Sequence, residues 1–161
     1  SEHLLKQGRK RIVFLGDPQL PEVAQRFEGY RAALAAAKVP ARAELELAVP
    51  FEVGAARAAV ASLLDRKVAF DAVVGCSDLL AISAMQVLRE HGRDVPRDVA
   101  VVGYDDMPLT NYCDPPLTSV HQPVPEAGVQ LVDALLAMLH GQVAAPRVLP
   151  VELVVRRSSQ A

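Results

Sequence analysis

The sequence predicts an α/β fold built on an open, doubly wound parallel sheet. Three short apolar runs, RIVFLG at 11–16, DAVVGC at 71–76 and VAVVGY at 99–104, lack the polar alternation of half-exposed strands. Helical patterns separate these runs, and such a β–α–β order requires parallel strands with right-handed crossovers. Aromatic residues make up only 4% of the chain, so Ala, Val and Leu carry most of the apolar content.

Three helices are expected between the strands, at about 21–38, 52–67 and 78–91. A weaker strand at 45–49 fits before the second helix. The apolar stripes of the second and third helices follow helical spacing. These stripes consist of Val53, Ala56, Val60, Leu63 and Leu64, and of Leu80, Ala84, Val87 and Leu88. Residues 2–8 resemble the last turns of a helix closed by a glycine.

The pattern changes after Asp106. Residues 107–119 contain three prolines and are expected to form an irregular connection. A long apolar helix follows, with Pro125 in its first turn and its end at His140-Gly141. Its stripe comprises Val124, Leu131, Val132, Leu135, Leu136 and Leu139. A final strand is expected at 148–156.

Bulk properties restrict the classes of function. The 161 residues suffice for a packed domain, and the net charge of −2 argues against autonomous nucleic-acid binding. The short basic run at 9–11 is interpreted as a solvated helix end. Cys76 and Cys113 lack metal-type spacing and the four histidines are isolated in sequence, so we expect a reduced, cytoplasmic chain without a metal or other cofactor. No signal peptide or membrane-spanning run is visible.

Polar residues follow three of the predicted strands. They are Asp17, Ser77 with Asp78, and Asp105 with Asp106. Ligands of open α/β sheets bind beyond the carboxyl ends of the strands. This edge is therefore the expected binding site.

The same edge of the sheet also allows a catalytic interpretation. Ser77, Asp105 and His121 occur in the chain order of an α/β-hydrolase triad. However, the sequence around Ser77, GCSDL, lacks the second glycine of a nucleophile elbow. In the alternative interpretation, Ser77 and Asp78 simply begin a helix as N-terminal capping residues. Glycine-rich nucleotide-binding motifs are also missing.

Several blocks in the same order resemble the lac repressor/gal repressor (LacI/GalR) family of bacterial transcriptional regulators. The stretch FDAVVGCSDLLAISAM at 70–85 is similar to the family's strand–Asn-Asp–helix segment, and VPRDVAVVGYDD at 95–106 to its best-known signature. PPLTSVHQP at 115–123 resembles the crossing strand, and PVELVVRRS at 150–158 the closing strand. Weaker matches lie at 8–12 and 26–30.

The resemblance implies two α/β subdomains that clamp a small effector, such as a sugar or a purine, without catalysis. Residues 1–123 and 147–161 would form the C-terminal effector-binding subdomain, and residues 124–146 would belong to an N-terminal subdomain that is otherwise absent. Operator DNA would be bound only through an upstream headpiece, and effector closure would shift subdomain orientation in a homodimer. A periplasmic sugar-binding protein of a transport system is the alternative from another class.

The resemblance also assigns site residues. Arg26 and Asp105 match the family's main polar effector contacts, and Gln122 matches a hinge residue. Ser77 stands where the family most often has Asn, which puts the usual pattern of sugar hydroxyl contacts in question. Phe51 approximately matches an aromatic platform, with Val49 as the rival position. Asp78 is interpreted as a helix cap and hinge support.

The long helix at 124–140 carries a further expectation. Six large apolar side chains on one stripe would be left in water if no second subdomain covered them. Soluble monomers seldom tolerate such a patch. We therefore expect this 161-residue chain to be at least a dimer, with this helix docked on another copy. A second dimer surface is expected near the helix at 78–91 and the loop at 109–113.

Overall fold

A six-stranded sheet in the order β2-β1-β3-β4-β5-β6 forms the centre of the fold in the computed structural model, which describes residues 1–160. Neighbouring strands from β2 to β5 pair in parallel, and β6 pairs antiparallel with β5. The strands are β1 (Ile12–Leu15), β2 (Glu46–Leu47), β3 (Ala72–Gly75), β4 (Ala100–Asp105), β5 (Thr118–His121) and β6 (Glu152–Val154).

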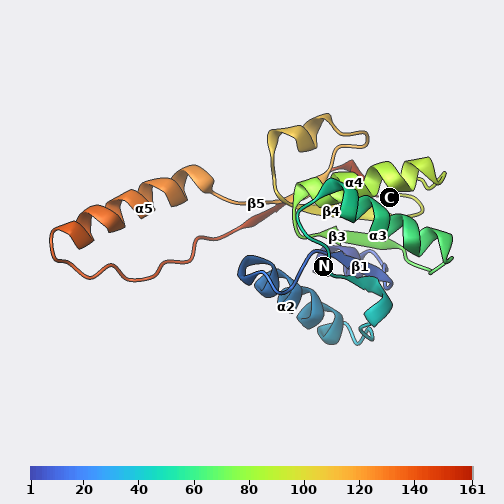
Figure 1. Cartoon of the computed structure of the whole chain (residues 1–161), viewed down its shortest axis with the longest axis horizontal. Helices are drawn as coiled ribbons and strands as arrows, with labels where there is room; N and C mark the ends of the chain where they lie inside the picture. Colours follow the sequence, from blue (N-terminus) through green and yellow to red (C-terminus); the bar gives the residue numbers. More distant parts are fainter. Residues whose placement is uncertain (161) are drawn as a thin grey trace.

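Helices cover both faces of this sheet. Figure 1 shows α2 on one side, and α3 with α4 on the other, which confirms the doubly wound α/β prediction. The α-helices are α1 (Glu2–Lys6), α2 (Pro21–Ala36), α3 (Val53–Asp65), α4 (Asp78–Glu90) and α5 (Val124–Leu139). Short 3-10 helices are η1 (Ala43–Leu45), η2 (Pro108–Tyr112) and η3 (Arg157–Ser159).

The boundaries depart from the sequence predictions at the edges of the sheet. The strand expected at 148–156 is reduced to β6, because only three residue pairs, such as Ser119 with Val154, join it to β5. The strand expected at 45–49 keeps two residues. The connection at 107–119 is not irregular throughout, since it contains η2 and the first residues of β5.

An aromatic cluster fixes α2 on the sheet. The ring centroids of Phe14 and Phe27 are 5.0 Å apart, and those of Phe14 and Tyr30 are 5.4 Å apart. The buried Tyr30 hydroxyl donates a 2.8 Å hydrogen bond to the Ile12 carbonyl of β1. Such packing of rings, together with a satisfied hydroxyl, fixes the rotation of α2 about its axis. This rotation determines where the polar residues of α2 point.

The basic run at 9–11 is not a solvated helix end. The Arg9 guanidinium donates to the carbonyl of Pro96 at 2.7 Å and also to those of Arg97 and Asp98. Arg11 forms a long ion pair of 3.7 Å with Asp71. The run therefore ties the start of β1 to the segment before β4, because guanidinium groups satisfy carbonyls that the loop leaves without partners.

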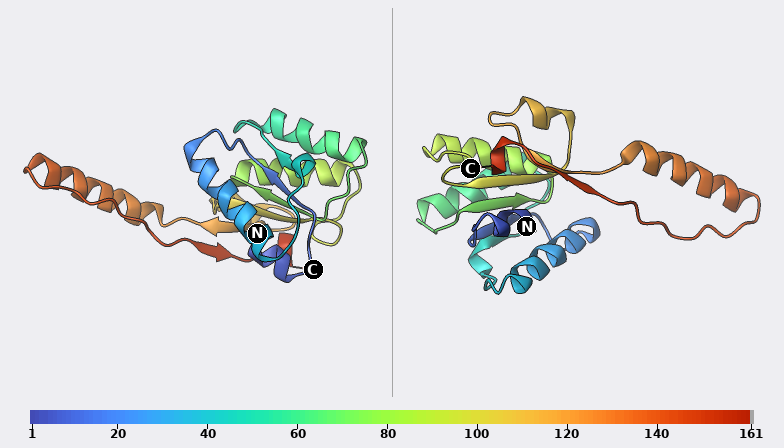
Figure 2. Two further views of the ribbon diagram at one scale, coloured as in Figure 1. Left: turned by 90° about the horizontal axis from the view of Figure 1, so that it is seen from below. Right: turned by 180° about the vertical axis from the view of Figure 1, so that it is seen from behind.

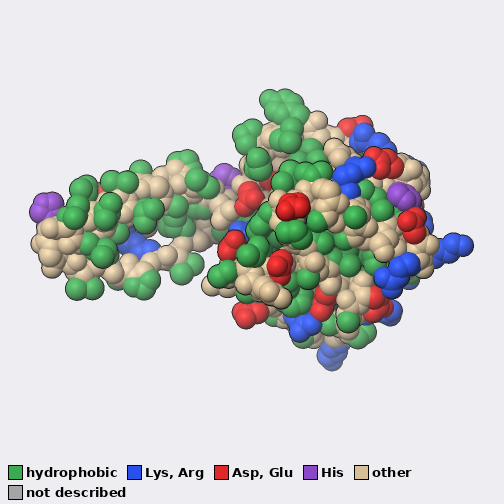
Figure 3. Space-filling model, viewed as in Figure 1, with side chains coloured by type: hydrophobic (Ala, Val, Ile, Leu, Met, Phe, Trp, Pro, Cys, Tyr) green, Lys and Arg blue, Asp and Glu red, His purple; other side chains and the backbone are tan. Residues whose placement is uncertain are grey.

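The α5 helix projects away from the sheet as an arm. Figures 1 and 2 show it at the far end of two extended segments, which leave β5 and return to β6. None of its residues is buried, and Leu131 and Leu139 are 73% and 74% exposed. Apolar side chains lie along the arm on the face shown in Figure 3. No helix within residues 1–160 is long and apolar enough to cross a membrane.

Candidate functional site

Arg26 extends from α2 to the carboxyl ends of β3 and β4. Its Nη1 donates to the Cys76 carbonyl, directly after β3, and its guanidinium lies 3.8 Å from the centroid of the Tyr104 ring. A cation on an aromatic face gains electrostatic stabilisation from the ring quadrupole. The Cys76 carbonyl is the one hydrogen-bond acceptor that this guanidinium has among residues 1–160. Its remaining N–H groups are available to a ligand.

Asp105 ends β4 beside this guanidinium. Its Oδ1 accepts a 2.7 Å hydrogen bond from Nε2 of Gln122, which follows β5. Burial raises the pKa of Asp105 above the ordinary 3.8, while the nearby Arg26 and the Gln122 amide act in the opposite direction. The three side chains thus meet at one edge of the sheet from α2, β4 and the end of β5.

A cavity of about 850 Å³ opens at this place. Arg26, Tyr104 and Gln122 line it together with α1 residues such as His3 and Lys6 and with apolar side chains on one face of the sheet, including Val102 and Leu153. Its volume lies within the range of small-molecule sites, roughly 300–1,000 Å³. The Arg26 guanidinium and the Gln122 amide in its lining, with the Asp105 carboxylate beside Gln122, suit a polyhydroxylated molecule, since an Arg fork and a carboxylate can serve as donor and acceptor to hydroxyl groups.

Two other predicted site residues occupy different positions. Ser77 is buried and is the N-cap of α4, where its hydroxyl accepts a hydrogen bond from the Leu80 amide at 3.4 Å. Phe51 is 39% exposed in the loop before α3 and does not line the cavity around Arg26. The rival position, Val49, is buried in the core.

Asp78 links α4 to the neighbouring strand β5 at the carboxyl edge of the sheet. It is fully buried, and its carboxylate accepts hydrogen bonds from the Ser119 hydroxyl at 2.5 Å and from the Met107 amide at 2.8 Å. Burial raises the pKa of this carboxyl, and the two hydrogen bonds oppose that shift. A Cβ at Gly103 would collide with Asp78 Oδ1, so β4 needs glycine there. Asp78 therefore joins α4 to β5 and η2, in agreement with a supporting role, while the helix cap is Ser77.

Sequence reasoning missed a second cluster, which is centred on Asp106. Its carboxylate pairs with Arg156 after β6 at 2.8 Å and with the His121 ring at the end of β5 at 3.1 Å. Asp105 and Asp106 both have positive φ values, 112° and 55°, a conformation that side-chain-bearing residues seldom adopt. The Asp106 amide is held by the Ser119 hydroxyl at 3.0 Å. This cluster clamps the two segments that lead to α5.

The sequence prediction also missed Tyr104 as a site residue. As part of an apolar run it is indistinguishable from a core residue, although the period of two puts it on the same face as Val102, which also lines the cavity. The pairing of Asp106 with Arg156 spans 50 positions, and neither residue carries a motif of its own.

The hydrolase arrangement is not formed. The His121 ring contacts Asp106 rather than Ser77, and the Ser77 hydroxyl is used in the cap of α4. Within residues 1–160, no group of three or more His, Cys, Asp or Glu side chains is placed to hold a metal ion.

Comparisons with known proteins extend over nearly the whole chain. A family profile described as a periplasmic binding protein-like domain matches residues 1–159. The HTH-type transcriptional regulator CelR of Thermobifida fusca is 38% identical over 161 residues, which are 98% of this chain and 47% of that protein. The HTH-type transcriptional repressor CytR of Escherichia coli is 33% identical over 162 residues, or 99% and 48% of the two chains. The chain thus spans about half the length of these relatives.

Solved structures agree with these relatives. A CelR–cellobiose complex superposes with a TM-score of 0.92 at 38% identity, covering 98% of this chain and 49% of that chain. The lac repressor dimer bound to operator and the anti-inducer ONPF also superposes with a TM-score of 0.92, at 29% identity and with coverages of 99% and 56%. The chain therefore belongs to the LacI/GalR family of transcriptional regulators, within their periplasmic-binding-protein-like domain.

Proposed function

We propose that this chain is the effector-sensing part of a transcriptional regulator and binds a small neutral sugar at the edge formed by Arg26, Tyr104, Asp105 and Gln122. The observation that carries the proposal is the meeting of an Arg fork, a carboxylate and an amide beside one cavity. The similar regulator crystallised with cellobiose supports the choice of a sugar. Ser77 and Phe51 remain predicted contacts, and each requires a ligand that reaches beyond this cavity.

The regulator acts by binding rather than catalysis. Sugar binding closes the cleft between the two subdomains and moves the segments after β5 and before β6. This movement changes operator affinity through a headpiece outside these residues. A cytoplasmic location follows from that role. The alternative of a periplasmic transport protein is not favoured, since the similar proteins are HTH-type regulators.

The division into subdomains belongs to the same proposal. Residues 1–123 and 147–161 form one subdomain, and residues 124–146 pack against a second subdomain for which the longer relatives have room. The absence of any buried residue in α5 supports this division. The regulator works as a homodimer, joined near α4 and η2, where Leu79, Leu109 and Tyr112 are exposed.

Calorimetry on the full-length protein tests the sugar site. Cellobiose is the first probe, followed by other neutral disaccharides. We expect saturable binding that Arg26→Ala weakens by at least about tenfold, because a charge-assisted donor is lost. The control Arg66→Ala removes an exposed arginine that lines none of the cavities. Equal affinity in the two variants would remove Arg26 from the site, and no sugar binding at all would overturn the proposed function.

A gel shift tests the assignment of DNA binding. The 161-residue chain alone is expected to leave an operator fragment unshifted at physiological salt, because it has a net charge of −2. Sequence-specific binding by this chain would contradict the assignment of DNA contact to a separate headpiece.

A further inference from the structure

A second cavity, of about 660 Å³, lies at the opposite edge of the sheet. Asp94 to Arg97 precede β4, and Asp114 with Pro115 precede β5, so this cavity is at the amino ends of the strands. The sugar site is at their carboxyl ends. The two cavities share no lining residue.

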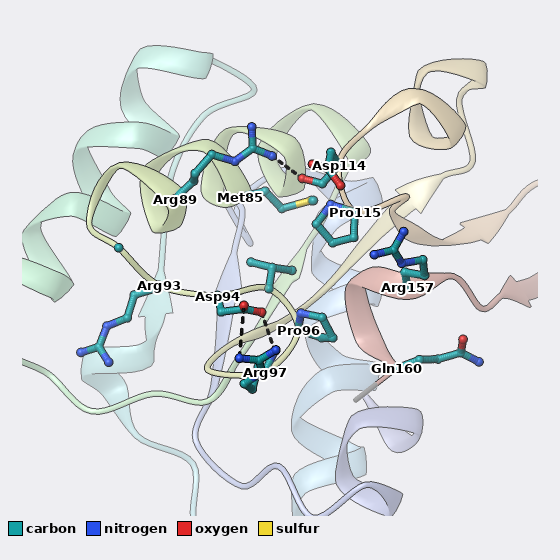
Figure 4. Close-up of a pocket in the computed structure, with 12 residues that line it drawn as sticks. Met85, Arg89, Arg93, Asp94, Pro96, Arg97, Asp114, Pro115, Arg157 and Gln160 are labelled. Carbon is teal, nitrogen blue, oxygen red and sulfur yellow. Dashed lines mark hydrogen bonds and ion pairs between the residues drawn. The ribbon is translucent and has the colours of Figure 1, made fainter.

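Arginine dominates the charge of this second cavity. Arg89 at the end of α4, Arg93 and Arg97 before β4, and Arg157 in η3 all line it, against the carboxylates of Asp94 and Asp114. The lining therefore has an excess of two positive charges in a chain whose net charge is −2. Figure 4 shows Arg89, Arg97 and Arg157 around the hollow, whereas Arg93 points away from it.

These guanidinium groups are only partly satisfied. Arg157 has no side-chain hydrogen bond or ion pair within residues 1–160, and Arg97 has only a 3.9 Å ion pair with Asp94 while its side chain is 83% exposed. Arg89 donates to the Asp114 carbonyl. Arg guanidinium groups match the geometry of phosphate oxygens, and they retain their charge at any physiological pH.

The backbone beside Arg157 is held firmly. The Ser158 hydroxyl donates to the Val101 carbonyl at 2.7 Å and accepts from the Thr118 amide at 2.8 Å. The Ser158 amide donates to the Pro116 carbonyl at 2.9 Å. A fixed backbone next to an unengaged guanidinium lowers the entropy that ligand binding costs.

We propose that this arginine-lined cavity, which we call the arginine pocket, binds a small phosphorylated ligand independently of the sugar site. The phosphate contacts Arg157, whose guanidinium has no partner among residues 1–160, while Arg97 and Arg89 contribute positive charge on the other sides of the pocket. Met85, Val95, Pro96 and Pro115 supply apolar lining surface against which an uncharged part of the ligand, such as a base, packs. The proposal does not rest on the sugar site, because the two cavities share no lining residue.

Calorimetric titration of the purified protein with AMP, ribose 5-phosphate, inorganic phosphate and adenosine tests this pocket. We expect AMP to bind, inorganic phosphate to compete with it, and adenosine to bind far more weakly. Ribose 5-phosphate isolates the contribution of the base: weaker binding than that of AMP means that the base packs on the apolar lining, and equal binding means that the base adds no contacts. The AMP affinity should fall as salt is added, because the pocket is open to solvent.

Three substitutions give the matched comparison. Arg157→Gln should weaken AMP binding by about tenfold or more. Asp94→Asn should strengthen it several-fold, because this change removes a negative charge and releases Arg97. Arg66→Gln, at an exposed arginine outside the pocket, should change nothing. Absence of phosphate-dependent binding, equal affinity for adenosine and AMP, or unchanged affinity in Arg157→Gln would each overturn the proposal.

Discussion

The helices α4 and α5 both carry an apolar stripe, but their environments are opposite. Eight of the thirteen residues of α4 are buried, including Leu80 and Leu88, whereas none of the sixteen residues of α5 is. Helical periodicity predicted both elements, and the stripe predicted for α4 is buried, whereas no residue of the stripe predicted for α5 is buried. The comparison shows that a stripe indicates which face will be covered, whereas the covering surface depends on the rest of the protein.

The largest expected effect is on folding stability. Leu88→Ala removes a fully buried side chain of α4 and should lower the free energy of unfolding by about 2–5 kcal/mol. Leu135→Ala, at a 56% exposed position on the α5 stripe, should change it by less than about 0.5 kcal/mol. Urea denaturation of the 161-residue chain at low protein concentration measures both. Similar losses in the two variants would mean that α5 packs on the sheet in solution.

The second effect concerns self-association of the same chain. Light scattering should show at least a dimer, because each apolar side chain of the α5 stripe gains roughly 1.5–3 kcal/mol if fully buried. The double change Leu135→Glu and Leu139→Glu should shift the chain toward monomer. Tyr112→Glu, on the exposed η2 surface, distinguishes the α5 interface from the interface near α4 and η2. A shift toward monomer in this variant would assign the contact to the surface near α4 and η2. A stable monomer with an ordered, exposed α5 would refute this expectation.

The third effect is on the sugar site, close to where the sheet joins the arm. In the full-length protein, Asp105→Ala should cost about 1.5–3 kcal/mol of effector binding, because a charge-assisted hydrogen bond is lost and its partner is left unpaired. Asp65→Ala, at an exposed carboxylate on α3, is the matched control. Unchanged affinity on calorimetry would exclude Asp105 from the site.

The smallest effect is a pH dependence of the same binding. Asp105 accepts hydrogen bonds from hydroxyl groups best when ionised, and burial raises its pKa above 3.8. Effector affinity should therefore be highest at neutral pH. On acidification it should fall at a higher pH than the one at which an aspartate with the ordinary pKa becomes protonated. Asp105→Asn should bind more weakly at neutral pH and lack this decline. The same acid sensitivity in the Asn variant would assign the titration to another group.

Arg26 and Asp105 illustrate how far the sequence predicts the candidate site. The family resemblance singled out both residues, and the structure brings them together with Gln122. Ser77 was also singled out, but the same position makes it the cap of α4, and its hydroxyl is buried. Position in a motif therefore does not tell whether a hydroxyl faces the ligand or the helix backbone.

The spacing of apolar residues was enough to predict the succession of strands and helices along the chain, because buried strands and amphipathic helices require different spacings. The sequence also determined the edge at which polar residues gather, since parallel strands all end on the same side. Three arrangements could not be predicted in this way and follow from the folded structure: Tyr104 lies against Arg26, Asp106 pairs with His121 and Arg156, and Arg89, Arg97 and Arg157 line one cavity. These residues are distant in the chain, and the packing of helices on a twisted sheet brings them together.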